Sequence, residues 1–151
     1  MTKQVPLTKG LFSTVDDDDY ETLSRWKWHI SGKYAVTCVG NGKRRTMQDM
    51  IVPHAPELCV DHINGDRLDN RKANLRVCTK RQNSYNRKVS KNNKVGLKGV
   101  SPQRNKFRAV IYWNYKRIHL GLFDSPELAG AAYDRKALEL YGEFAKINGS
   151  R

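Results

Sequence analysis

Residues 60–86, VDHINGDRLDNRKANLRVCTKRQNSYN, decide how the rest of the chain is interpreted. This stretch places Asp61 directly before His62, Asn74 twelve residues after His62, and Asn83 nine residues after Asn74. A carboxylate and a carboxamide bind cations, and an imidazole moves protons near neutral pH. These four side chains are therefore the candidates for chemistry.

The same stretch carries local signals for its secondary structure. Turn-forming Asn, Asp and Gly residues follow His62, and a short apolar run extends over 75–78. Thr79 and Gln82 then form a capping-box pattern, which is typical of a helix start. We expect a strand, a loop, a second strand and a helix, with Asn83 in the first turns of that helix.

This arrangement resembles the HNH nuclease motif, in the variant whose third letter is Asn. The resemblance implies a ββα-metal fold with one divalent metal ion, Mg²⁺ or Mn²⁺, held by Asp61 and Asn83. It implies that His62 acts as the general base and that Asn74 braces the loop or orients His62. The alternatives are an ordinary surface loop and an EF-hand, and the loop lacks the Asp and Asn spacing of an EF-hand.

Composition points to a polyanionic partner. The 151 residues contain 28 Lys and Arg against 15 Asp and Glu, a net charge of +13, which favours nucleic acid. The chain has no apolar run of membrane-spanning length and no secretory signal pattern at its N-terminus, so we expect a cytoplasmic protein. Cys59 and Cys78 lack C-x-x-C spacing, and we interpret them as small buried residues rather than ligands.

The first third of the chain predicts short strands within 4–15 and a helix that begins at the acidic run 16–19. A hairpin should follow, with strands at 34–39 and 44–50. This part is similar to the segment that precedes the motif in phage HNH proteins. Those proteins often carry a His-Arg pair where this chain has Gln48 and Asp49, and the sequence does not decide whether this difference reduces activity.

Residues 79–98 hold seven Lys or Arg and no acid. Such a segment is flexible when free, and its cations gain affinity for DNA by releasing counterions. We expect phosphate contacts from Lys80, Arg81, Arg87 and Lys88. The predicted division is a nuclease module at 1–89, a basic linker at 90–97 and a DNA-binding domain at 98–151.

The last third predicts two strands, 107–112 and 117–123, and a helix capped by Ser125 and ended by Gly142. The apolar face of this helix contains Leu128, Ala132 and Leu138, with neighbouring Ala131 and Tyr141. A third strand would complete the sheet. Strand alternation places one set of side chains toward the helix: Phe107, Ala109, Ile111, Ile118, Leu120 and Leu122. The fold class is thus α+β, a ββα-metal module followed by a three-stranded antiparallel sheet packed on one helix.

This region resembles the plant APETALA/ethylene-response-factor DNA-binding domain in GV (99–100), IHLGLFD (118–124), AAYD (131–134) and AKIN (145–148). In that family the exposed sheet face enters the major groove. Arg108 and Arg117 are our candidates for base reading, because bidentate Arg contacts discriminate guanine. The predicted DNA-contacting residues are Lys98, Arg104, Lys106, Arg108, Tyr112, Arg117 and His119. Ser101 and His119 stand where plant domains place Arg and Trp, so the plant target sequence does not transfer.

Together these features predict a metal-dependent endonuclease acting on double-stranded DNA. By resemblance it is a phage homing-type enzyme that nicks one strand in the bacterial cytoplasm. We expect a monomer or weak dimer and no protein partner. A non-catalytic DNA-binding regulator with a degenerate nuclease half is the alternative, and a structural RNA-binding protein is the third.

Overall fold

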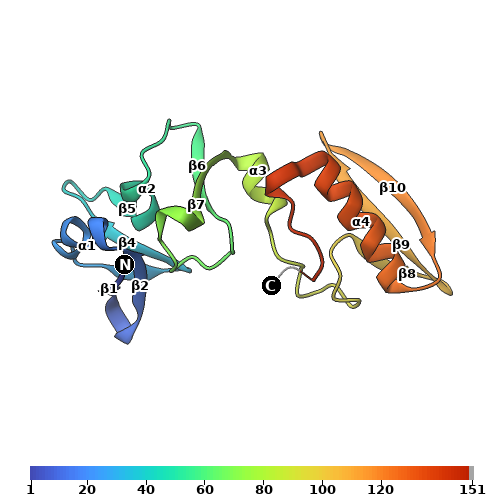
Figure 1. The fold of residues 1–151 in the computed structure, drawn as a ribbon, viewed down its shortest axis with the longest axis horizontal. Helices are drawn as coiled ribbons and strands as arrows, with labels where there is room; N and C mark the ends of the chain where they lie inside the picture. Colours follow the sequence, from blue (N-terminus) through green and yellow to red (C-terminus); the bar gives the residue numbers. More distant parts are fainter. Residues whose placement is uncertain (150–151) are drawn as a thin grey trace. The chain divides into compact units, whose positions relative to one another are not determined.

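The computed structural model describes residues 1–149, and its fold is mixed α/β with small antiparallel sheets (Figure 1). The chain forms two compact units, Met1–Asn83 and Ser84–Arg151. Among the described residues, no helix is long and apolar enough to cross a membrane.

The first unit is built from three small sheets and short helices. β1 (Thr2–Pro6) pairs with β2 (Phe12–Asp16), and α1 (Asp17–Ser24) begins at the acidic run. β3 (His29–Ser31), β4 (Tyr34–Cys38) and β5 (Arg44–Thr46) form the second sheet, followed by α2 (Met47–Ile51). β6 (Leu58–His62) and β7 (Leu75–Thr79) form the third, and α3 (Lys80–Tyr85) follows.

The core of the first unit gathers around Trp28, which is 2% exposed and donates its indole N–H to the Leu23 carbonyl oxygen at 2.8 Å. Val5, Val15 and Met47 pack in the same cluster. This satisfied donor lets a large aromatic ring fill the core without leaving a buried polar group unpaired.

The strand expected at 44–50 is wrong in its second half. β5 ends at Thr46, and residues 47–51 form α2. Thr46 occupies the N-cap position without a side-chain bond to the helix backbone, and its hydroxyl donates to Oδ2 of Asp49 at 2.5 Å within the first turn. Gln48 and Asp49 therefore lie on a helix, and Gln48 is buried.

The second unit is a three-stranded sheet in the order β10-β9-β8, with α4 along one face (Figure 1). Its elements are β8 (Val100–Gln103), β9 (Lys106–Trp113), β10 (Lys116–Phe123) and α4 (Pro126–Tyr141). The Ser125 hydroxyl accepts from the Leu128 N–H at 3.2 Å, which is the expected N-cap. Asn114 and Tyr115, both with positive φ, form the β9–β10 turn.

A β-bulge corrects the predicted inward set of β10. The register shifts between His119 and Gly121, so Leu122 pairs with Arg108 and Phe123 pairs with Phe107. Leu122 is consequently 46% exposed, whereas Phe123 packs in the core. One extra residue reverses the face of every side chain beyond it.

The apolar face predicted for α4 is also wrong in part. Leu128 and Leu138 are exposed, whereas Tyr141 is buried as expected. Gly130 is buried as well, and the remaining buried residues are Ala129, Tyr133 and Ala137. Their spacing of four residues places them on one helix face, where two small side chains let the helix approach the sheet closely. Two apolar residues of the basic segment, Val95 and Leu97, pack against the same core.

Gly99→Ala will lower the free energy of unfolding by about 3 kcal/mol or more, because a Cβ there would lie 2.0 Å from the Tyr133 ring and 2.7 Å from the Val110 carbonyl oxygen. Gly96→Ala is the matched control. Gly96 has the same φ of +75°, but no atom lies within 4 Å of its added Cβ, so its cost is the backbone strain alone, about 1 kcal/mol. Urea unfolding of both variants measures the difference, and equal losses would contradict the steric account.

Candidate active site

The β6–β7 hairpin positions the first two candidate residues. Asp61 and His62 end β6, where Asp61 pairs with Arg76 and His62 pairs with Leu75. Successive side chains on a strand point to opposite faces, so the two groups have different hydrogen-bond partners. Both are buried, at 5% and 4% exposure, which means that each polar group needs a defined partner.

A chain of hydrogen bonds fixes the His62 ring. The Ser13 hydroxyl donates to the Leu68 carbonyl oxygen at 2.9 Å, and the Asn70 amide nitrogen donates to the Ser13 oxygen at 2.8 Å. The amide oxygen of Asn70 therefore faces Nε2 of His62, at 3.0 Å, and accepts from it. This order of donors and acceptors puts the proton of neutral His62 on Nε2 and makes Nδ1 the basic nitrogen.

The loop that supplies Asn70 is docked on β2. The Thr14 N–H donates to the Leu68 carbonyl oxygen at 2.8 Å, and the Asn70 N–H donates to the Thr14 carbonyl oxygen at 2.7 Å. These backbone bonds place Asn70 next to Ser13 and hold it there. The rotamer of His62 is thus set by a strand near the start of the chain.

The surroundings of His62 disfavour its charged form. Burial is the largest effect and lowers the pKa of His62 below its usual value, as does the nearby Arg67. The Asn70 hydrogen bond, Asp61 and Asp66 act in the opposite direction. The net direction favours a neutral imidazole, the form that accepts a proton.

Asn74 ties the two ends of the loop together. Its amide nitrogen donates to the Asp69 carbonyl oxygen at 2.8 Å, and its oxygen accepts from the Asn64 N–H at 3.0 Å. The Asp69 carboxylate in turn accepts from Arg71 at 2.6 and 2.7 Å, and this pairing lowers the pKa of Asp69. Asn74 was expected either to brace the loop or to orient His62, and these contacts favour bracing the loop. The residue that contacts the His62 imidazole is Asn70.

Asp61 forms a buried ion pair. Nη2 and Nε of Arg76 lie 2.9 and 3.1 Å from Oδ2 of Asp61, and the two side chains are 12% and 6% exposed. The pair follows from strand register, since the two residues face each other across the hairpin. Removing either partner would leave the other charge buried without this ion pair, which is costly.

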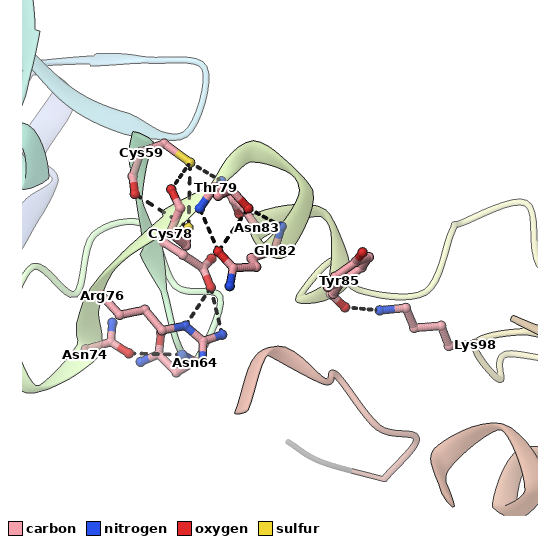
Figure 2. Close-up of polar contacts among 11 residues, drawn as sticks. Cys59, Asn64, Asn74, Arg76, Cys78, Thr79, Gln82, Asn83, Tyr85 and Lys98 are labelled. Carbon is pink, nitrogen blue, oxygen red and sulfur yellow. Dashed lines mark hydrogen bonds and ion pairs between the residues drawn. The ribbon is translucent and has the colours of Figure 1, made fainter. Parts of the chain in front are cut away.

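Asn83 lies on the same face of the hairpin as Asp61. Its amide nitrogen donates to the Cys59 sulfur at 3.7 Å (Figure 2), and Cys59 is two residues before Asp61 on β6. Cys59 pairs with Cys78, and their sulfur atoms are 3.7 Å apart. Burial raises the pKa of the Cys78 thiol to about 12, so this thiol stays protonated. Cys78 is buried, as its interpretation as a small buried residue requires, whereas Cys59 is only partly buried.

The helix start that carries Asn83 is formed as expected. The Thr79 N–H donates to Oε1 of Gln82 at 2.9 Å, and the Gln82 N–H donates to the Thr79 hydroxyl at 3.2 Å (Figure 2). This reciprocal pair is a capping box, which orients the first turn of α3.

The donor chemistry at this face fits a hard divalent cation. Asp61 offers carboxylate oxygen and Asn83 a carboxamide oxygen, whereas the Cys78 thiol beside them remains protonated. Among residues 1–149, no group of three or more His, Cys, Asp or Glu side chains is placed to hold a metal ion. Arg76 bonds the same carboxylate, and a cation there would share Asp61 with it.

The residues predicted to contact DNA are mostly exposed. Nine of them lie on the surface: Lys80, Arg81, Arg87, Lys88, Arg104, Lys106, Tyr112, Arg117 and His119. Lys98 and Arg108 are partly buried. The Lys98 ammonium donates to the Tyr85 carbonyl oxygen at 2.5 Å (Figure 2), and burial lowers its pKa to about 8.

Three residues of the site were missed by sequence reasoning: Ser13, Asn70 and Arg76. Strand pairing around the loop would have indicated Arg76, because it is the register partner of Asp61. Ser13 and Asn70 are 57 residues apart, and no local pattern connects them. Their contact depends on how the loop packs on β2.

Comparison with known proteins bears on this same region. Residues 52–85, which contain β6, β7 and α3, match the family described as HNH endonuclease. Over 145 residues the chain is 31% identical to a protein of Acanthamoeba polyphaga mimivirus named an uncharacterized HNH endonuclease. That alignment covers 93% of this chain and 76% of the relative. The chain belongs to the HNH endonuclease family.

This HNH endonuclease also has a phage relative. It is 35% identical over 90 residues to Protein 3.8 of Escherichia phage T7, which covers 58% of this chain and 74% of the phage protein. No solved structure gives a significant match. The family assignment confirms the expectation of an endonuclease, and it implies DNA as the substrate.

Proposed function

We propose that this protein is a metal-dependent DNA endonuclease that nicks one strand, with His62 as the general base. The observation that carries the proposal is the hydrogen-bond chain from Leu68 through Ser13 and Asn70, which leaves Nδ1 of His62 as the proton acceptor. Nδ1 takes a proton from the attacking water, and the lowered pKa of His62 keeps the ring ready to do so.

Asp61 and Asn83 would hold one divalent ion, Mg²⁺ or Mn²⁺, in a ββα-metal arrangement of β6, β7 and α3. Such an ion stabilises negative charge on the phosphate and on the leaving oxygen. Asn74 supports this centre indirectly, because it closes the loop that carries Asn70. The match over residues 52–85 and the hard oxygen donors support this assignment.

The second unit would bind the DNA as an APETALA/ethylene-response-factor-like domain. Its sheet of three strands backed by α4 and its exposed Arg117 support this role. We retain the division into 1–89, 90–97 and 98–151 as a functional proposal, although the compact units meet at Asn83 and Ser84. A phage homing-type role in the bacterial cytoplasm, as a monomer or weak dimer, belongs to the same proposal.

The regulator alternative rested on Gln48 and Asp49. Those residues lie on α2, outside the matched stretch, and the similar mimivirus protein is named an endonuclease. The comparisons therefore do not favour it. Nicking of supercoiled plasmid in Mg²⁺ or Mn²⁺, and its loss on adding EDTA, tests the proposed function. DNA binding without nicking in either metal would contradict it.

Asn70→Asp should move the acidic limb of the pH–nicking profile to higher pH. A carboxylate 3.0 Å from Nε2 would stabilise the imidazolium and raise the pKa of His62, so the base would become protonated at a higher pH. Asn70→Ala is the control: it removes a bond that raises this pKa, so the limb should move to lower pH. Nicking rates across pH at saturating metal measure both shifts, and a purely structural Asn70 would give neither.

A further inference from the structure

The second unit contains a pocket of about 500 Å³, within the range of ligand sites. It forms where the sheet is incomplete: β8 pairs with β9 only from Lys106 to Ala109, and β9 continues to Trp113. Residues 110–112 of β9 line the pocket.

The lining combines positive charge with aromatic rings. Lys98, Arg108 and Arg117 line it, and no Asp or Glu does so among the described lining residues. Two of its four tyrosines are committed to packing, since Tyr85 stacks on Tyr141 at 3.8 Å between ring centroids. These two rings form a packed part of the pocket wall.

Two lining groups are available to a ligand. The side chain of Tyr112 is exposed, at 60% for the residue, on the outward face of the sheet. Nε of Arg108 is buried and has no hydrogen-bond partner among residues 1–149, while its Nη2 donates to Ser101 at 3.3 Å. An unsatisfied buried donor is costly unless something outside the protein accepts from it.

The register places these groups on one face of the sheet. Every second residue of β9 points to this face, which gives Arg108, Val110 and Tyr112. Arg117 is the direct cross-strand neighbour of Tyr112. The smaller side chain of Val110 lies between the long side chains of Arg108 and Tyr112. A ligand here would meet an aromatic plane and two guanidinium groups at once.

Anionic charge and a flat ring occur together in a nucleotide. We propose that this pocket receives one nucleotide, with its base stacked on Tyr112 and its phosphate held by Arg108 and Arg117. The inference deepens the proposed DNA-binding role of the second unit and rests on it. Paired bases are stacked within a duplex, so the nucleotide must be turned out of the strand, or be free in solution.

The test measures binding by the full-length protein in EDTA, where no cleavage intervenes. Three labelled DNAs of the same sequence are compared by fluorescence anisotropy: a fully paired duplex, a duplex with one extra unpaired nucleotide, and the same duplex with an abasic extra residue. We expect the unpaired nucleotide to bind about tenfold tighter than either control, as expected for one base stacked on an aromatic side chain.

Variants then locate the effect. Tyr112→Ala and Arg108→Gln should each reduce that preference to about twofold or less, by loss of stacking and of a phosphate contact respectively. Arg135→Gln is the matched control, since Arg135 is exposed on α4 and outside the pocket lining; it should keep the preference. Equal affinity for all three DNAs, or a preference that survives both pocket variants, would overturn the inference.

Deoxyadenosine monophosphate distinguishes the two sources of the nucleotide. Weak competition against the unpaired-nucleotide duplex supports a nucleotide from the DNA strand. If deoxyadenosine monophosphate competes as strongly as the unlabelled duplex does, and Arg108→Gln abolishes this competition, the ligand of the pocket is a free nucleotide. A protein that prefers the unpaired nucleotide but never nicks plasmid would refute the proposed catalytic function alone.

Discussion

His62→Ala will reduce nicking of supercoiled plasmid by about 10²- to 10⁴-fold, the usual contribution of a general base. The imidazole is buried and its Nε2 is committed to Asn70, so Nδ1 is the nitrogen that can accept the proton of water. Initial nicking rates at saturating Mg²⁺ or Mn²⁺ measure the loss. The affinity for DNA, measured in EDTA, should stay within about twofold because the proposed DNA contacts lie on other residues.

His29→Ala is the matched control for this substitution. His29 belongs to the same compact unit, but its Nε2 contacts Arg44 at the surface, 3.1 Å away. It should retain wild-type nicking. If His62→Ala keeps substantial activity, or if it loses DNA binding in parallel with nicking, His62 is not the base and the hydrogen-bond chain serves the fold.

Local chemistry made several parts of this structure predictable. The capping box at Thr79 and the N-cap at Ser125 each depend on residues three positions apart, and both form as expected. The β9–β10 strands were predictable for a similar reason, because alternation and a turn are both local.

The incorrect predictions share a physical cause. In each case the local sequence is compatible with more than one structure, and tertiary packing determines which one forms. Thr46 can end a strand or cap a helix, and the burial of Met47 in the core accompanies the helix. The bulge after His119 inserts a single residue that no alternation pattern shows. On α4 Ala129 and Ala137 are buried, whereas Leu128 and Leu138 face solvent, because close approach to the sheet favours small side chains.

The same distinction between local and tertiary causes applies to the residues of the candidate site. Asp61, His62, Asn74 and Asn83 stand out in the sequence because their spacing is fixed within one segment. The partner that orients His62 was not predictable, since Asn70 acquires its position from Ser13 on a distant strand. Sequence thus indicates which groups are present, and the docked loop determines which nitrogen of His62 is basic.

Asp61→Ala will abolish metal-dependent nicking and lower the free energy of unfolding by about 3–5 kcal/mol, because it leaves the Arg76 guanidinium buried without its carboxylate. Urea unfolding and plasmid nicking measure the two effects. The stability loss alone would also reduce activity, so the single variant does not separate a metal ligand from a structural ion-pair partner.

The double variant Asp61→Ala/Arg76→Met makes that separation. It removes both charges from a site where the pair is 6% and 12% exposed, and replacing a buried ion pair by apolar groups is often neutral for stability. We expect it to recover most of the lost stability and none of the nicking, in Mg²⁺ or Mn²⁺. Recovered nicking would mean that Asp61 serves only to neutralise Arg76, and the cation would then have to be held elsewhere.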